Sequence, residues 1–320
     1  MSTVPSGELR FRQGRSGDLA ATHALAERSL ADAARRQGVN PGGADPDPAG
    51  FEERWRLDRP LIEFIAAQEG CYWLCEERGE LVGFARVARF EAMEELTELM
   101  VAPGHYGRGI GRGLVERCWP GPPTPTMGRV VVAAGAAADL SLYADFGVLP
   151  VTGHWHLRHS VEEYVLRRSQ ETADLGQPDI HLLNADRAVE EWQRLEPPAV
   201  GFARPALHEF FGRTRTCLAR FDAAGGEVVG LCWVSPRGEV GPAVGATPED
   251  LVPVVLAALD RSAKVQEPEW LGVYCTTDSW WLLRHLRRLG FTVYWPSWIM
   301  SSVPLPGLDR FMPTRPAHLL

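Results

Sequence analysis

A glycine-rich segment between two predicted elements has the residue types and spacing needed to bind a phosphate. It reads Gly107-Arg108-Gly109-Ile110-Gly111-Arg112-Gly113 and joins an apolar strand pattern to a helical one. Glycine opens backbone conformations in which successive N–H groups converge, and the helix adds unpaired N–H groups and its positive dipole end. Arg108 and Arg112 add guanidinium groups suited to phosphate oxygens. The segment predicts an anion-binding loop; a glycine-rich turn without a ligand is the alternative.

Two common nucleotide-binding loops do not match this segment. A Walker A loop needs Lys and then Ser or Thr, whereas Arg112 and Gly113 stand at the corresponding positions after Gly107. A dinucleotide fingerprint needs G-x-G-x-x-G after the first strand of a βαβ unit. Here the glycines have a different register and follow about four strand-like segments. A Walker-type ATP site and a dinucleotide site are therefore not expected.

The remaining pattern is a strand ending at Val101-Ala102-Pro103 followed by x-G-R-G-I-G-R-G-L-V. It resembles the acyl-CoA pyrophosphate loop of the GNAT superfamily of N-acetyltransferases, usually written Q/R-x-x-G-x-G/A, with Tyr106 at the position of Gln or Arg. The resemblance implies acetyl-CoA as the acyl-donor cosubstrate. It also implies that Tyr106, Gly107, Arg108, Gly109, Ile110, Gly111 and Arg112 hold the pyrophosphate and that Leu99, Met100 and Val101 hold the pantetheine arm.

Acyl transfer to an amine needs a base, a stabilised oxyanion and a proton for the departing thiolate. Glu94, Glu95 and Glu98 lie just before or within the strand that leads to the loop, and alternation predicts Glu95 and Glu98 on opposite faces. The resemblance implies a carboxylate base on this strand. Glu95 lies eleven residues before Tyr106, a spacing similar to that in members acting on lysine side chains. Glu95 is preferred to Glu98, and a solvated acidic strand end is the alternative. The backbone at the strand end is expected to meet the oxyanion.

Tyr143 is the candidate general acid. Superfamily members carry N-x-x-A-x-x-x-Y-x-x-x-G-F, in which the tyrosine lies close to the CoA sulfur. The segment Tyr143-Ala144-Asp145-Phe146-Gly147-Val148 keeps the tyrosine and the glycine in register. Ala136 stands at the Asn position and Val148 at the Phe position, so one family contact to CoA is missing. A buried core tyrosine is the alternative.

Composition favours some classes of protein and argues against others. The 320 residues are 45 % hydrophobic with a net charge of −8, which favours a cationic substrate over nucleic acid. No apolar run reaches membrane-spanning length and no signal-peptide pattern is present, so we expect a cytoplasmic protein without a membrane partner. The six scattered cysteines are expected as buried small hydrophobes. His154, His156 and His159 lack further ligand types nearby, so no metal is expected.

The pattern of apolar residues in the first half predicts a mixed α/β domain, in the order implied by the GNAT resemblance. The expected strands cover residues 9–12, 71–76, 81–90, 96–101, 130–133, 150–159 and 163–167. The expected helices cover 19–36, 51–68 with an interruption near Pro60, a segment that begins in the glycine loop and ends near Trp119, and 136–146.

The second half contains echoes of the first. Residues 79–87 are echoed by 226–234 at an offset of 147, and residues 143–148 by 286–291 at an offset of 143. Two ordered echoes at nearly one offset predict a duplicated domain. The segment matching the glycine loop, 244–251, carries acidic residues where a phosphate needs donors, so only the first half is expected to bind CoA.

We therefore expect an α/β (α+β) fold of two tandem GNAT-like mixed-sheet domains. A catalytic domain is expected at 1–168, a linker at 169–178 and a degenerate domain with a tail at 179–320. The expected activity is acetyl transfer from acetyl-CoA to a primary amine of a small molecule or peptide, with Glu95 and Tyr143 catalytic. The first alternative is a non-catalytic acyl-CoA sensor, and the second is a partner-binding scaffold. The acceptor and the oligomeric state stay open.

Overall fold

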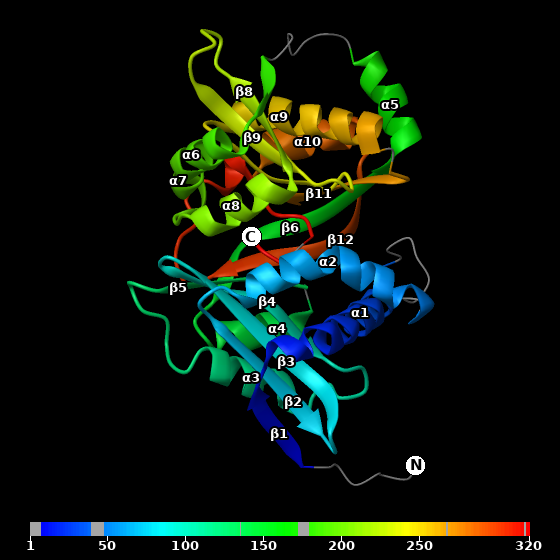
Figure 1. Ribbon diagram of the computed structural model, residues 1–320, viewed down its shortest axis with the longest axis vertical. Coiled ribbons are helices and arrows are strands. Elements are labelled where there is room, and N and C mark those ends of the chain that lie inside the picture. The colour runs from blue at the N-terminus through cyan, green and yellow to red at the C-terminus, as the bar shows by residue number, and fades with distance from the viewer. Residues whose placement is uncertain (1–7, 40–47, 135, 172–178, 267, 317) are drawn as a thin grey trace. The chain divides into compact units, whose positions relative to one another are not determined.

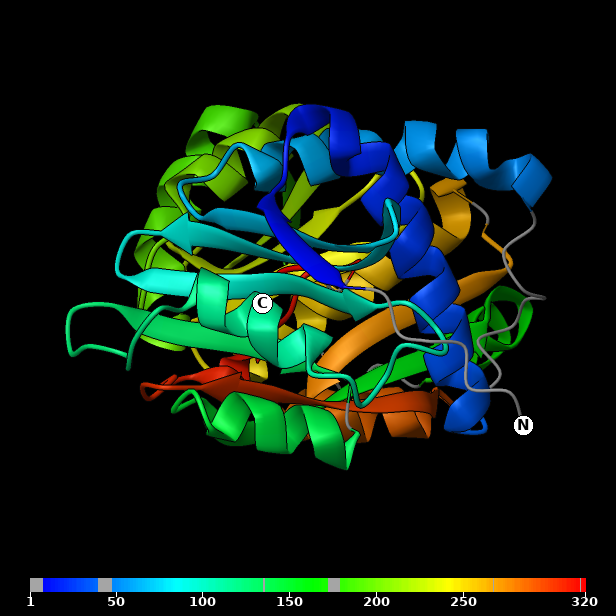
Figure 2. The ribbon, with the colours of Figure 1, turned by 90° about the horizontal axis from the view of Figure 1, so that it is seen from below.

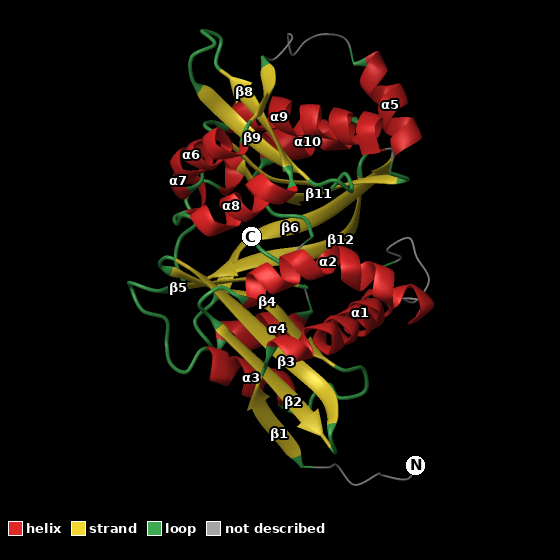
Figure 3. Ribbon diagram, viewed as in Figure 1, coloured by secondary structure: helices red, strands yellow, loops and turns green. Residues whose placement is uncertain are grey.

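The computed structural model describes residues 8–39, 48–134, 136–171, 179–266, 268–316 and 318–320 (Figure 1). Helices and strands are mixed along the whole chain (Figure 3), which confirms the expected α/β (α+β) class. The chain divides into two compact units. The first unit comprises Met1–Arg129 with Asp145–Gly147, and the second comprises Val130–Ala144 with Val148–Leu320.

Four antiparallel strands and three α-helices form most of the first unit. They are β1 (Leu9–Gln13), α1 (Leu19–Arg36), α2 (Phe51–Ala66), β2 (Cys71–Glu77), β3 (Glu80–Phe90), β4 (Met93–Val101) and α3 (Ile110–Cys118). The strands lie in the order β1-β2-β3-β4. Figure 2 shows α1 and α2 in blue along the cyan strands. Each of these elements was expected from the sequence to within a few residues.

Helices cover both faces of this sheet. Gly83 and Phe84 are consecutive on β3 and therefore face opposite sides. Phe84 is buried in a cluster with Leu25 of α1. On the other side, a Cβ added at Gly83 would collide with Ile110 of α3 at 2.8 Å and lie in tight contact with Leu114 at 3.3 Å. Because β4 belongs to this sheet and α3 packs on it, both ends of the loop between β4 and α3 are held in place.

Helix α2 continues through Pro60, so the expected interruption there is wrong. Proline removes one helical hydrogen bond because it has no N–H. Pro60 lies on the exposed side of the helix, where water can solvate the freed carbonyl. Burial of Ile62 and Ile65 on the other side holds the helix together.

The second unit contains two groups of paired strands. From Val130 on, β5 (Gly128–Ala133) pairs with β12 (Thr292–Ser301), which pairs with β6 (Leu149–Ser160), which pairs with β11 (Trp270–Thr276). The other group has the order β13-β10-β9-β8-β7. These strands are β7 (Ile180–Leu183), β8 (Thr216–Phe221), β9 (Val228–Val234), β10 (Val240–Gly245) and β13 (Phe311–Met312). The helices are α4 (Ala137–Ala144), α5 (Val161–Gln170), α6 (Ala185–Leu195), α7 (Pro197–Val200), α8 (Pro205–Thr214), α9 (Pro248–Arg261) and α10 (Trp280–Arg288).

The strand expected over 163–167 is wrong, because this segment lies in α5. Ser160 caps the helix by accepting a hydrogen bond from the N–H of Glu163 at 3.3 Å. Acidic residues occupy the first turn and arginines the last, which favours the helix dipole. Strand β12, from near the end of the chain, lies between β5 and β6.

The order of elements confirms the expected duplication. After α5 the chain runs β7, α6, α8, β8, β9, β10, α9, β11, α10 and β12, which repeats the order from β1 to β6 apart from the short α7. The sequence echoes fall on β3 and β9 and on α4 and α10. The compact units nevertheless divide at 129 rather than near 168, because β12 pairs with β5 and β6. The boundaries 1–168, 169–178 and 179–320 stay a prediction, and residues 172–178 of the expected linker lie outside the described residues. None of the described helices combines the length and the apolar character that crossing a membrane requires.

Candidate functional site

The loop between β4 and α3 has the backbone shape of an anion cradle. Gly104, Gly107 and Gly109 have φ angles of 83°, 73° and 78°, a region that side chains disfavour. A Cβ added at any of the three would have no atom within 4 Å, so open space lies beside them. The first bond along α3 runs from Gly113 N to Gly109 O at 2.9 Å, which leaves the preceding N–H groups of the helix start for a ligand. The loop therefore fits the pyrophosphate of an acyl-CoA.

Both arginines of the loop are paired with carboxylates of the chain. The Arg108 guanidinium donates to both oxygens of Glu77, at 2.9 and 2.7 Å, and Arg112 donates to Asp145 at 2.5 Å. The positive charges that Arg108 and Arg112 were expected to add beside the cradle are therefore partly neutralised. A bound phosphate would share the guanidinium groups with these carboxylates, so the backbone supplies the dedicated donors.

Tyr106 contacts α1. Its hydroxyl donates to Asp32 at 3.0 Å, and the Arg36 guanidinium carbon lies 4.3 Å from the centre of its ring. Partial burial and the neighbouring carboxylate raise the pKa of Tyr106. The side chain that stands in place of Gln or Arg thus links the cradle to α1.

The strand end expected to hold the pantetheine arm pairs with β3. Leu99, Met100 and Val101 lie opposite Ala85, Phe84 and Gly83. All three are partly exposed, and the Val101 carbonyl accepts a hydrogen bond from the Ser29 hydroxyl at 3.1 Å. Their contact with the arm stays a prediction.

Glu95 and Glu98 lie on the same face of the sheet, and the expected opposite placement is wrong. Glu98 pairs with Arg86 in the β3–β4 register, but the next pair is Val87 with Leu96, so Thr97 is an extra residue. Such a bulge reverses the alternation that follows it. Glu95 then pairs with Ala88, two positions along β3 from Arg86. The Thr97 hydroxyl fixes the bulge by donating to the Arg86 carbonyl at 3.1 Å.

Glu98 forms a buried ion pair with Arg86. An Nη1 to Oε2 distance of 2.7 Å joins the two groups, and both side chains are about 1 % exposed. The Arg86 guanidinium also lies 4.8 Å from the centre of the Tyr72 ring and 3.4 Å from the Thr22 hydroxyl. One oxygen of Glu98 is therefore held by Arg86.

Replacing Arg86 by Met is expected to lower the free energy of unfolding by about 3–5 kcal/mol, because the Glu98 carboxylate stays buried without its guanidinium. Urea denaturation measures the change. The double variant Arg86→Met/Glu98→Leu is the control and should recover at least half of the loss. Equal losses in the two proteins would contradict this account of the pair.

Glu95 is buried, with 2 % of its surface exposed. The alternative interpretation of these glutamates as a solvated acidic strand end is therefore wrong for both Glu95 and Glu98. Buried carboxylates are rare in proteins and cluster at functional sites. Its catalytic role stays a prediction.

Tyr143 lies on α4 in the second unit and is 5 % exposed. Burial, and next the negative charge of Asp139, raises the pKa of its phenol well above the usual value. A tyrosine is protonated at neutral pH at its ordinary pKa as well, and the rise makes this phenol a weaker proton donor. The cradle, Glu95 and the Arg86–Glu98 pair belong to the first unit. The alternative of a core tyrosine stays open.

Sequence reasoning missed Arg86 as part of the site. A charged residue inside the apolar run 82–90 was the available signal, because such a residue needs a buried partner. The partner, Glu98, lies opposite it on the neighbouring strand, in a register that no residue pattern indicates.

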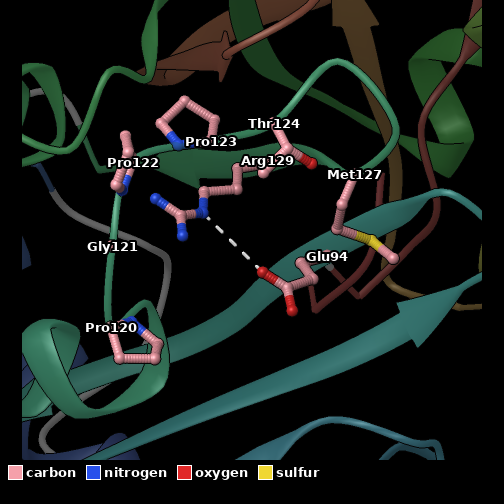
Figure 4. Close-up of a pocket in the computed structure, with 8 residues that line it drawn as sticks. All are labelled: Glu94, Pro120, Gly121, Pro122, Pro123, Thr124, Met127 and Arg129. Carbon is pink, nitrogen blue, oxygen red and sulfur yellow. Dashed lines mark ion pairs between the residues drawn. The ribbon is translucent and has the colours of Figure 1, made fainter.

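A pocket of about 250 Å³ in the first unit lies apart from the cradle (Figure 4). Arg129 and Glu94 line it at 3.7 Å from each other. Glu94 is near the start of β4 and Val101 at its end, so the strand separates pocket and cradle by roughly 23 Å. The remaining lining residues are Pro120, Gly121, Pro122, Pro123, Thr124 and Met127.

The histidines and cysteines form no metal cluster among the described residues. His154 is buried and lies 2.8 Å from the Ser297 hydroxyl, and burial lowers its pKa to about 3. All six cysteines are free thiols, and five of them are buried, as expected.

Residues 68–147 match the family described as acetyltransferase (GNAT) domain. No curated protein sequence matches the chain at a significant level. Its fold is similar to that of a putative acetyltransferase from Pyrococcus horikoshii, with a TM-score of 0.65 and 15 % identity over 95 % of this chain and 92 % of that one. A tandem GNAT protein from the clavulanic acid biosynthesis pathway has a TM-score of 0.60 and 16 % identity, covering 93 % and 99 %. A GCN5-related N-acetyltransferase from Sphaerobacter thermophilus has a TM-score of 0.55 and 16 % identity, covering 92 % and 96 %. At these identities the structural likeness shows the fold.

Proposed function

Because residues 68–147 match the GNAT acetyltransferase domain and the fold is similar to that of a tandem GNAT protein, we propose that the chain transfers an acetyl group from acetyl-CoA to a primary amine of a small molecule or peptide. The observation that carries the proposal is the loop after β4, where Gly107 and Gly109 have positive φ angles, open space lies beside them and α3 begins. Acetyl-CoA, when bound, supplies an acyl group activated as a thioester.

Each group of residues has a part in the proposed transfer. The backbone from Tyr106 to Arg112 holds the pyrophosphate, and the strand end from Leu99 to Val101 holds the pantetheine arm. Glu95, buried on the strand that leads to the cradle, takes the proton of the attacking amine. Tyr143 gives a proton to the leaving group, because it stands at the position at which the family pattern places a tyrosine beside the CoA sulfur.

Tyr143→Phe is expected to lower kcat by about 100-fold while the KM for acetyl-CoA changes by less than about threefold. Release of free CoA thiol in the presence of a panel of primary amines measures the rate. Tyr274→Phe is the matched control, since Tyr274 is a partly buried tyrosine of the second unit that is not part of the proposed site. A Tyr143→Phe enzyme with wild-type turnover would remove the acid assignment and leave Tyr143 as a core residue.

A non-catalytic acyl-CoA sensor is the second candidate. The observations that favour it are the pairing of Arg108 and Arg112 with carboxylates and the absence of Asn at position 136. This candidate predicts CoA binding with no thiol release for any amine. A scaffold with neither property predicts no CoA binding.

A further inference from the structure

The segment from Leu308 to Pro316 lies between two strands of the second half. Phe311 and Met312 form β13 and pair with Val244 and Ala243 of β10. The Arg315 guanidinium donates to the Gly272 carbonyl of β11 at 2.9 Å. The segment therefore contacts both β10 and β11, and it extends the sheet at the edge of β10.

Strands β10 and β11 hold the same places in the second half as β4 and β5 in the first, since the element order is repeated. By the GNAT resemblance, the pantetheine arm adds to the end of the strand that precedes the phosphate loop. In the second half that strand end is Ala243 and Val244 of β10, which already pair with β13. The chain's own backbone thus takes the position that an acyl-CoA arm would take.

The segment also reaches the loop that corresponds to the phosphate cradle. Arg310 donates to the carbonyls of Ala246 and Pro198, at 2.6 and 2.9 Å. The helix start beyond Ala246 is capped by Thr247 and Asp250, whose side chains bond each other's N–H groups at 3.2 Å. In this loop a backbone carbonyl accepts a hydrogen bond from a cation, and the N–H groups at the helix start donate to side chains of the loop itself. A phosphate site needs N–H groups that donate to the ligand instead.

Ser279 also contacts the segment 308–316, and the sequence echo shows which residue of the first half it corresponds to. Ser279 lies 143 positions after Ala136, the offset of the second echo, and Ala136 stands at the CoA-contacting Asn of the family pattern. The Ser279 hydroxyl is 2.8 Å from the Leu308 carbonyl and 3.1 Å from the Phe311 carbonyl. One hydroxyl proton serves one of these carbonyls at a time, and the Thr276 hydroxyl donates to Leu308 as well, at 2.7 Å.

We propose that residues 308–316 are a built-in peptide occupant of the second half's cofactor cleft. The cleft is a sheet-edge groove for an extended peptide that carries an arginine followed by two apolar residues. Resting on the proposed function of the first half, this leaves one acyl-CoA site for each chain.

Calorimetric titration of CoA tests the number of sites. The wild type is expected to bind one CoA per chain, and Gly109→Glu is expected to bind none. A CoA site that persists in Gly109→Glu would overturn the proposal, because it would have to lie outside the first cradle. A wild type that binds no CoA would instead overturn the proposed function of the first half. The hydrogen-exchange experiment then tests by itself whether residues 308–316 occupy the cleft.

Hydrogen exchange on the full chain tests whether the segment behaves as an occupant. Arg310→Ala removes both contacts of that guanidinium, so amides in 240–245 and 308–314 should exchange about tenfold faster or more, while those in 216–221 keep their rates. Arg213→Ala is the matched control, because Arg213 is exposed at the end of α8. Unchanged rates at 240–245, or an equal rise throughout β8 and β9, would overturn the proposal.

Discussion

Gly109→Glu is expected to abolish CoA binding, weakening it by at least ~100-fold. The residue has a φ angle of 78°, so any side chain there strains the backbone by roughly 1–2 kcal/mol. The carboxylate would also project into the open space where the pyrophosphate is expected, and like charges repel strongly once desolvated. Calorimetric titration measures the loss.

Gly225→Glu is the matched control for this variant. Gly225 has a φ angle of 71° and open space beside it, so the same backbone strain arises outside the cradle. Its CoA affinity should stay within about twofold of the wild type. Equal losses in both variants would show that strain, and not the cradle, explains the effect.

Glu95→Gln is expected to lower kcat by roughly 10²–10⁴-fold, the usual contribution of a general base. The KM for acetyl-CoA should hardly change, because the amide keeps the shape of the side chain. Steady-state rates with an accepted amine measure both constants.

Glu94→Gln is the control for position on the strand. Glu94 adjoins Glu95 but pairs with Arg89 at 2.8 Å and lines the separate pocket, so its kcat should stay within about threefold of the wild type. If Glu95→Gln kept full activity and Glu98→Gln lost it, the base would be Glu98 and the role of Arg86 would need revision.

The parts of the site that the sequence predicts are those set by local backbone chemistry. The run from Gly107 to Gly113 predicts a turn of positive φ and a helix start because glycine and helix ends act over a few residues. The strand before it follows from its apolar pattern. These features alone suffice to place the cradle.

What the sequence leaves undetermined depends on contacts between distant residues. The extra residue at Thr97 places Glu95 and Glu98 on the same face of the sheet, and only the register with β3 reveals this placement. The segment 163–167 carries apolar residues that suit a strand or a helix, and the cap at Ser160 decides for the helix. No local pattern indicates that β12 lies between β5 and β6.

The position of β12 has a consequence for how the protein is made. Until residue 301 has left the ribosome, β5 and β6 lack the strand that joins them, and each presents unpaired N–H and C=O groups. At typical synthesis rates of roughly 5–20 residues per second, more than a hundred residues must follow β6 before β12 emerges, so the exposed edges last for several seconds or longer. The two halves of this duplicated chain are therefore expected to reach the native state together, at the end of translation.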